Sequence, residues 1–201
     1  MIFGNERRTT RWAVLVLLGI AFLVTPARAQ APWTIERLMH ELQQVKSATA
    51  RFVQLKYLAA LTAPLQSSGA LIYAAPDKIE MKTERPKPET IAIAGDQLIT
   101  VSNNGRQRRF LSLDDYPEAG AIIESIRSTL SGNLPGLQRF YDVHLDGDET
   151  SWTLSLVPTL AKLHETIDSV VIQGSANAIR SIEIREIDGD RSVMTVTPDN
   201  P

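Results

Sequence analysis

Few residues in this chain are of the types that catalysis or metal binding requires. The 201 residues include three histidines, His40, His144 and His164, and no cysteine. The lack of cysteine excludes disulfides, thiolate metal sites and cysteine nucleophiles. His40 follows Glu36 by four residues in a segment with helical periodicity, which is more typical of a surface pair than of a metal site. No zinc-protease, nucleophile-elbow or phosphate-loop motif is present.

Two short segments bring carboxylates close together in the sequence. Residues 146–149 read Asp-Gly-Asp-Glu, and residues 188–190 read Asp-Gly-Asp. The first lacks the later glutamate of a calcium-binding loop, and both are typical of solvated hairpin turns. We therefore predict no catalytic residue, no metal and no cofactor, and a protein that is not an enzyme. A hydrolase that uses His144 or His164 beside a serine and a carboxylate is the less favoured alternative.

The N-terminal segment 1–29 has the pattern of a secretory signal peptide. Basic residues precede an unbroken apolar run over 12–24, and Ala-Arg-Ala at 27–29 gives the small-residue cleavage pattern. The rival interpretation is a membrane anchor, but the run is shorter than the roughly 20 residues that cross a bilayer. We expect an exported, periplasmic protein with one domain over residues 30–201.

The charge balance argues against nucleic acid as a partner. The whole chain has 21 basic and 23 acidic residues, a net charge of −2. Residues 1–29 hold four arginines and one glutamate, so the remainder has 17 basic and 22 acidic residues, a net charge of −5. Nucleic-acid-binding domains are usually strongly basic.

The periodicity of the remaining chain predicts many strands and two long helices. Apolar residues recur with helical spacing over 33–47, with Thr34 as N-cap, and over 117–130, with Gly132 at its end. Short strand-like runs are separated by turn residues. They predict about eleven strands, at 51–57, 68–73, 78–83, 90–94, 98–102, 106–111, 140–145, 151–157, 166–173, 179–187 and 191–197. Antiparallel strands in hairpin order with few helices indicate an α+β fold with a curled or closed sheet.

Strand alternation predicts that one side of this sheet is apolar. Side chains two residues apart share a face. On three neighbouring strands this places together the pairs Leu71 and Tyr73, Ile79 and Met81, and Ile91 and Ile93. The two amphipathic helices are the candidates to cover them. Periodicity alone favours an ordinary packed core, and the alternative is a loose cover with an apolar ligand beneath it.

A local positive patch follows the turn at 103–105. Arg106, Arg108 and Arg109 lie close together in a chain that is otherwise acidic. One interpretation is a solvated hairpin end. The other is a docking patch for an acidic partner or for lipid headgroups.

Several motifs in order resemble those of the LolA family, the periplasmic carriers of outer-membrane lipoproteins. The resemblance begins with the first helix and Phe52-x-Gln54, and continues through Gly69–Pro76 and Gly95-Asp96-Gln97-Leu98. It ends with Trp152–Pro158 and the closing segment Ile182–Thr197. It covers residues 33–197, nearly the whole chain after the signal peptide.

The resemblance implies a fold and a function. The fold would be a half-open antiparallel β-barrel of about eleven strands covered by lid helices, as in LolA and LolB. The cargo would be an acylated lipoprotein or another lipid, received from an inner-membrane exporter and passed to an outer-membrane acceptor by a monomer without a cofactor. Ala75 stands where well-studied carriers have an arginine associated with holding the lid closed. This departure indicates a divergent branch, whose cargo is a lipoprotein or another acylated or polyene lipid.

The carrier hypothesis assigns roles to particular side chains. Arg106, Arg108 and Arg109 would dock a partner. The ligand would contact residues of the two helices and of three strands, namely Leu38, Leu42, Val45, Leu71, Tyr73, Ile79, Met81, Ile91, Ile93, Ile122 and Ile126. The alternative function is a periplasmic lipid-sensing or regulatory binding module on the same fold.

Overall fold

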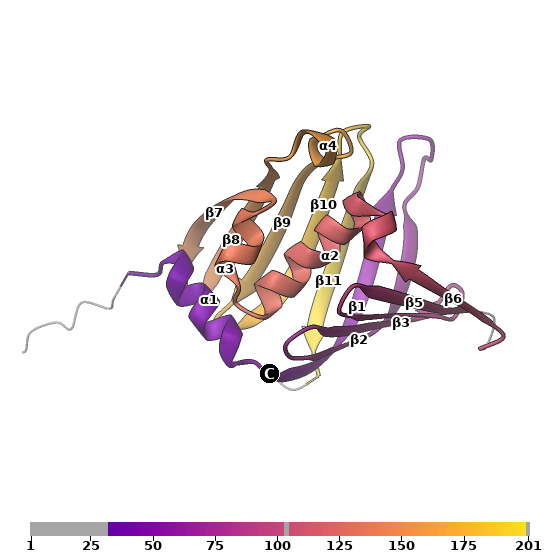
Figure 1. Cartoon of the computed structure of the whole chain (residues 1–201), viewed down its shortest axis with the longest axis horizontal. Coiled ribbons are helices and arrows are strands. Elements are labelled where there is room, and N and C mark those ends of the chain that lie inside the picture. Colours follow the sequence, from indigo (N-terminus) through magenta and orange to yellow (C-terminus); the bar gives the residue numbers. More distant parts are fainter. Residues whose placement is uncertain (1–31, 103–104, 200–201) are drawn as a thin grey trace, which may run out of the picture. The chain divides into compact units, whose positions relative to one another are not determined.

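The computed structural model describes residues 32–102 and 105–199, and the predicted signal peptide lies outside the described residues. Within the described residues, eleven antiparallel strands form a single sheet (Figure 1). The strands are β1 (Ser47–Tyr57), β2 (Leu65–Ala74), β3 (Lys78–Arg85), β4 (Glu89–Ala94), β5 (Gln97–Ser102), β6 (Gln107–Ser112), β7 (Tyr141–Asp148), β8 (Ser151–Pro158), β9 (Ile167–Ser175), β10 (Ala178–Glu186) and β11 (Arg191–Pro198). Their spatial order is β6-β5-β4-β3-β2-β1-β11-β10-β9-β8-β7, which makes β6 and β7 the two edges. Every neighbour pair except β1–β11 is a sequential hairpin or connection.

Helices lie on one face of the part of the sheet formed by β7 to β11 (Figure 1). They are α1 (Ile35–Gln44), α2 (Pro117–Leu130), α3 (Leu134–Gln138) and α4 (Ala161–His164), with a short 3₁₀ turn, η1 (Leu113–Asp115), before α2. No helix in the described ranges is long and apolar enough to span a bilayer.

Local sequence signals explain where the two long helices begin and end. The hydroxyl of Thr34 accepts a hydrogen bond from the backbone N–H of Arg37 and so caps α1. Pro117 opens α2, where its fixed φ suits the first helical turn. Gly132 follows α2 with a φ of +67°, and a Cβ there would overlap the backbone oxygen of Met39. Glycine therefore allows the end of α2 to lie directly against α1.

The central strand β1 joins the two halves of the sheet. It pairs with β2 on one side, where Phe52 lies opposite Gly69, and with β11 on the other, where Phe52 lies opposite Val196. A Cβ on Gly69 would overlap the backbone oxygen of Lys82 on β3, so the absence of a side chain lets the strands approach at this irregular point in the pairing.

The hydrophobic core lies between the helices and strands β7 to β9. Its members come from all four helices and three strands: Leu38, Met39, Leu42, Ala121, Leu137, Tyr141, Trp152, Leu154, Leu156, Leu163, Ile167, Val170 and Ile172. Trp152 lies over Gly174, and its indole N–H donates to the backbone oxygen of Ala176 at 2.9 Å. A buried aromatic side chain with its polar atom satisfied is a strong anchor for a core.

The α+β prediction with an antiparallel sheet of about eleven strands is confirmed. The helix predicted over 117–130 has these same bounds in the structure, whereas the first helix is shorter than predicted and ends at Gln44. Strand β1 begins at Ser47, four residues before the predicted start. Three short elements, η1, α3 and α4, were not predicted.

Candidate functional site

The pairing registers place side chains of all eleven strands on one common face of the sheet. In the packed half, Leu154, Ile172, Ile182 and Met194 are successive cross-strand partners. On β1, Gln54 lies opposite Met194. Since side chains alternate along a strand, Phe52, two residues before Gln54, points to the same face. We call this the inner face, because the core residues of β8 and β9 on it contact the helices.

The inner face continues across β2 to β5 through the residues predicted from strand alternation. Leu71, Met81 and Ile91 are direct cross-strand partners. In the next row, Tyr73, Ile79 and Ile93 are partners in the same way, and the row extends to Leu98 and Leu111. The structure therefore brings together all six strand residues named from the sequence.

The two halves of the inner face differ in burial. Leu154, Val170 and Ile172 in the packed half are 0% exposed. In contrast, Leu71, Met81 and Ile91 are partly exposed and belong neither to the hydrophobic core nor to the residues packed against it. Tyr73, close to the central strand, is buried, and burial raises the pKa of its hydroxyl above the ordinary value. The inner face of β2 to β6, here called the open half, thus presents apolar side chains that the core leaves partly uncovered.

The helix residues predicted to contact a ligand are divided between core and surface. Leu38 and Leu42 of α1 are fully buried in the core, and Val45 at the end of α1 is partly exposed. Ile122 and Ile126 of α2 are both partly exposed. Ile122 packs against the core, whereas Ile126 is not among the residues that do.

The most buried side of α2 consists of small residues. Ala121, Ser125, Ser128 and Thr129 are each at most 5% exposed. Their hydroxyls bond within the helix: Ser125 donates to the backbone oxygen of Ile122 at 2.7 Å, and Thr129 to that of Ser125 at 2.7 Å. Because these side chains are small and the hydroxyls of Ser125 and Thr129 are hydrogen-bonded within the helix, α2 can lie close to the core. Its isoleucines remain partly exposed.

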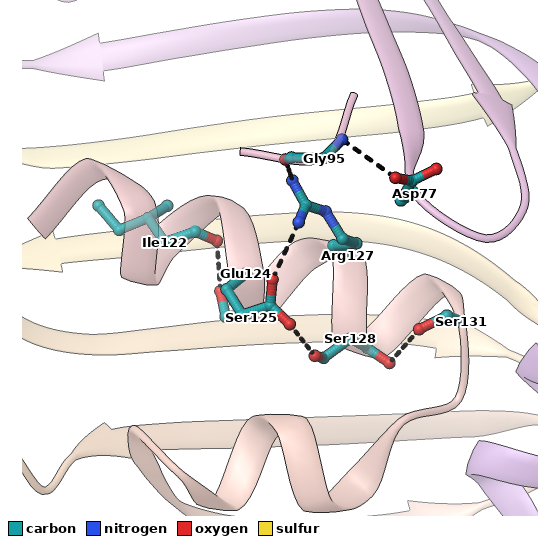
Figure 2. A network of polar contacts seen from close by, with 8 residues as sticks. All are labelled: Asp77, Gly95, Ile122, Glu124, Ser125, Arg127, Ser128 and Ser131. Carbon is teal, nitrogen blue, oxygen red and sulfur yellow. Dashed lines mark hydrogen bonds and ion pairs between the residues drawn. The ribbon is translucent and has the colours of Figure 1, made fainter. Parts of the chain in front are cut away.

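One arginine connects α2 to the open half of the sheet (Figure 2). Arg127 donates from Nη2 to the backbone oxygen of Gly95, in the turn between β4 and β5, at 2.6 Å. The backbone N–H of Gly95 in turn donates to Oδ2 of Asp77, in the turn between β2 and β3, at 3.0 Å. Arg127 also pairs with Glu124 at 3.2 Å, and Ser128 donates to the same carboxylate at 2.9 Å. Two hairpin turns and the helix are therefore joined by one connected set of polar contacts.

A cavity of about 350 Å³ lies beside this contact, between α2, η1 and the turn that holds Gly95. It is lined by Asp96, Leu113, Asp114, Pro117, Gly120, Ala121, Glu124, Arg127, Arg139 and Phe140. The lining combines five charged side chains with apolar ones, so the space beside α2 has both polar and apolar walls.

The three arginines predicted to dock a partner are all exposed, but they do not share a face. Arg108 and Arg109 are adjacent on the edge strand β6. Arg109 lies opposite Thr100 on the inner face, whereas Arg108 lies opposite Val101 on the outer face. Arg106 lies in the preceding turn. Beside Arg109, Phe110 is 68% exposed and also faces outward.

The carboxylates at 188–190 and the histidines considered from the sequence lie in a turn and at exposed positions, respectively. The carboxylates of Glu186, Asp188 and Asp190 lie within 4.8 Å of one another. Asp188 accepts the backbone N–H of Asp190 at 3.0 Å, as turn residues do, and Asp190 accepts that of Ala59, just after β1, at 2.8 Å. His144 on β7 and His164 at the end of α4 are exposed.

A sequence profile of the family described as outer membrane lipoprotein carrier protein LolA-like matches residues 25–197. The chain belongs to this LolA-like family. Members of the family are carrier or binding proteins rather than enzymes, so membership indicates a lipid- or lipoprotein-binding module. Among curated proteins, no sequence match is found for the LolA-like chain.

Solved structures with a similar arrangement have little sequence in common with this LolA-like chain. A LolA superfamily protein from Nitrosomonas europaea is 11% identical, with a TM-score of 0.42, over 81% of this chain and 90% of that one. A putative outer membrane lipoprotein-sorting protein domain from Vibrio parahaemolyticus is 9% identical, with a TM-score of 0.46, over 83% and 91%. The Pseudomonas aeruginosa MucA/MucB complex is 9% identical, with a TM-score of 0.44, over 81% of this chain and 54% of that one.

Arg127 was not predicted from the sequence. Its i,i+3 spacing from Glu124 is a recognisable helix pair. However, the spacing carries no information that the guanidinium reaches a turn 32 residues earlier in the chain.

Proposed function

We propose that this protein is a periplasmic carrier that shields the acyl chains of lipoproteins or of a related lipid and ferries them towards the outer membrane. The observation that carries the proposal is the open half of the inner face. Its apolar side chains, Leu71, Met81 and Ile91 among them, are partly exposed although they lie on the same face as the core. An apolar surface of this kind gains free energy when an acyl chain covers it.

The cargo would lie between the open half and α2. Ile126, which is partly exposed and not packed against the core, would contact it from the helix side, with Ile122 beside it. Leu38 and Leu42 would be reached only if α1 moved away from the core, since both are fully buried there. We therefore rank these two as secondary contacts, whereas Val45 at the end of α1 is partly exposed.

A carrier must release its cargo as well as bind it. An acyl chain with about 15 buried methylenes gains about 12 kcal/mol, at about 0.8 kcal/mol each. Displacing α2 to admit the chain would break the hydrogen bond between Arg127 and Gly95. Loss of this contact in the loaded state would offset part of the gain and favour transfer to an acceptor.

Export and partners complete the proposal. Residues 1–29 would act as a signal peptide, with a single carrier domain over 30–201. Arg106, Arg108 and Arg109, all exposed, would face an inner-membrane exporter or an outer-membrane acceptor. The alternative, a lipid-sensing or regulatory module, is favoured by exposed Phe110 beside these arginines on an edge strand, a surface suited to a protein partner.

Photocrosslinking from two adjacent positions of β4 tests the carrier proposal. A photoreactive amino acid would replace Ile91, on the inner face, or Ala92, on the outer face, and both positions are partly exposed. The protein would be irradiated in the periplasm and its adducts identified by mass spectrometry. A lipid or lipoprotein adduct at position 91 and not at 92 is expected. Absence of acyl adducts from both positions, together with a protein adduct, would favour the regulatory module.

A further inference from the structure

The open half of the inner face changes from apolar to cationic along one cross-strand row. Leu71, Met81 and Ile91 are successive partners on β2, β3 and β4. The row then continues through Thr100 on β5 to Arg109 on the edge strand β6. An apolar surface thus ends at a hydroxyl and a guanidinium.

Arg109 is placed to meet a charged group on a ligand rather than on the protein. It is exposed, and within the described ranges it forms no ion pair. The carboxylate on the same face of the open half, Glu89, lies on β4, two strands away and opposite Ser102 on β5. Two strand spacings are about 10 Å, beyond ion-pair distance for the backbone positions. Arg108, by contrast, points to the outer face.

The length of the row fits an acyl chain. Four spacings separate β2 from β6, which corresponds to about 19 Å at about 4.8 Å each. The hydrocarbon of one bilayer leaflet is about 15 Å thick. A chain of this length laid across the strands from Leu71 covers about three spacings and would bring its polar end to Thr100 on β5, one strand from Arg109.

We infer that the open half binds an acyl chain that ends in a single carboxylate, with the chain across β2 to β4 and the carboxylate at Arg109. The inference rests on the proposed function and narrows its cargo to a related lipid with a free carboxylate, since the acyl chains of lipoproteins are bound as esters or amides and carry none. The guanidinium of Arg109 matches one negative charge, and its planar donors suit two carboxylate oxygens. The Thr100 hydroxyl beside it supplies a further donor.

Competition binding with matched amphiphiles tests the inference. Laurate, lauryl alcohol and dodecyl phosphate, all below their micelle concentrations, would displace a fluorescent acyl probe from the protein without its signal peptide. We expect laurate to bind about fivefold more tightly than the alcohol, as one charge-assisted contact allows at an exposed site. The preference should shrink at high ionic strength.

Two single variants on adjacent positions separate the head contact from general surface charge. Arg109→Gln should bind laurate and alcohol equally, and Arg108→Gln should keep the wild-type ratio. An unchanged ratio in Arg109→Gln, or an equal loss in both variants, would overturn the inference while the alcohol still bound and the carrier proposal stood. Tighter binding of dodecyl phosphate than of laurate would overturn the assignment to a carboxylate. Failure of every amphiphile to bind would overturn the carrier proposal and the inference together.

Discussion

Arg127 of α2 and Gly95 of the β4–β5 turn are joined by a 2.6 Å hydrogen bond from the guanidinium to the backbone oxygen. The side chain of Arg127 is 16% exposed, so this contact is largely shielded from solvent. It connects a helix that packs on the core to the half of the sheet that the core leaves partly uncovered. In the proposed carrier, this bond would have to break when α2 moves to admit a ligand to the open half.

Replacing Arg127 with alanine should speed acyl-probe binding and lower stability. The variant loses the contact with Gly95 and leaves Glu124 without its cation, which costs about 1–3 kcal/mol for a partly buried charged group. Stopped-flow fluorescence would give the association rate, and urea titration the free energy of unfolding. Arg185→Ala, which removes an exposed pair with Glu183, is the control and should change neither quantity by much. An unchanged association rate in Arg127→Ala would contradict the role of this contact.

Truncations on the two halves of the inner face should have opposite signatures. Leu154→Ala empties a fully buried position and should cost about 2–5 kcal/mol of unfolding free energy. Met81→Ala removes a partly exposed side chain outside the core and should cost less than about 1.5 kcal/mol, but weaken binding of the acyl probe. Chemical denaturation and probe titration on both variants measure the contrast. Equal destabilisation by the two truncations would show that the open half is packed like the core.

Gly174→Ala should destabilise the protein although it adds only one methyl group. A Cβ at this position would overlap Cζ2 of Trp152 and the backbone oxygen of Ala178. The indole would have to shift and weaken its hydrogen bond to Ala176, at a cost of about 1–3 kcal/mol for overpacking. Tryptophan fluorescence and thermal unfolding report both effects. Ser175→Ala, at the partly exposed neighbouring residue, should be close to neutral.

Tyr141 should make stability fall with pH in the alkaline range. Burial raises the pKa of its hydroxyl from 10.0 to about 12 in the folded protein. Between pH 10 and 12 the unfolded chain therefore binds fewer protons at this site than the folded chain, and stability declines by at most about 1.4 kcal/mol per pH unit. Urea titrations across this range should show a shallower decline for Tyr141→Phe than for the wild type. Identical slopes would mean that this hydroxyl titrates normally.

The sequence pattern was most informative where one local property decides the structure. Pro117 and the run of isoleucines were enough to place α2 at its observed bounds, and strand alternation grouped Leu71, Met81 and Ile91 on one face. Strand β1 was predicted too short because Ala48 and Ala50 have low strand propensity, while in the structure they lie opposite Tyr73 and Leu71. Tertiary pairing decides such residues.

Properties that depend on distant partners were not predictable in this way. The spacing of Ile122 and Ile126 indicated the buried side of α2, whereas the fully buried side is made of small residues such as Ala121 and Ser125. Close approach to the core selects small side chains, and a hydrophobicity pattern does not register it. The three arginines near β6 were grouped as one patch by their closeness in the sequence, but Arg108 and Arg109 lie on opposite faces of the sheet because adjacent residues of a strand alternate.

The unpaired edge at β6 has a consequence for what such a surface selects. The apolar row reaches this edge without meeting a closing strand, because the sheet order ends there. In the described part of the sheet, a ligand tail seated on the row would therefore meet no further strand beyond its head. Selectivity would rest on the length and saturation of the tail and on the charge that meets Arg109, while the bulk of a larger head group would remain in solvent.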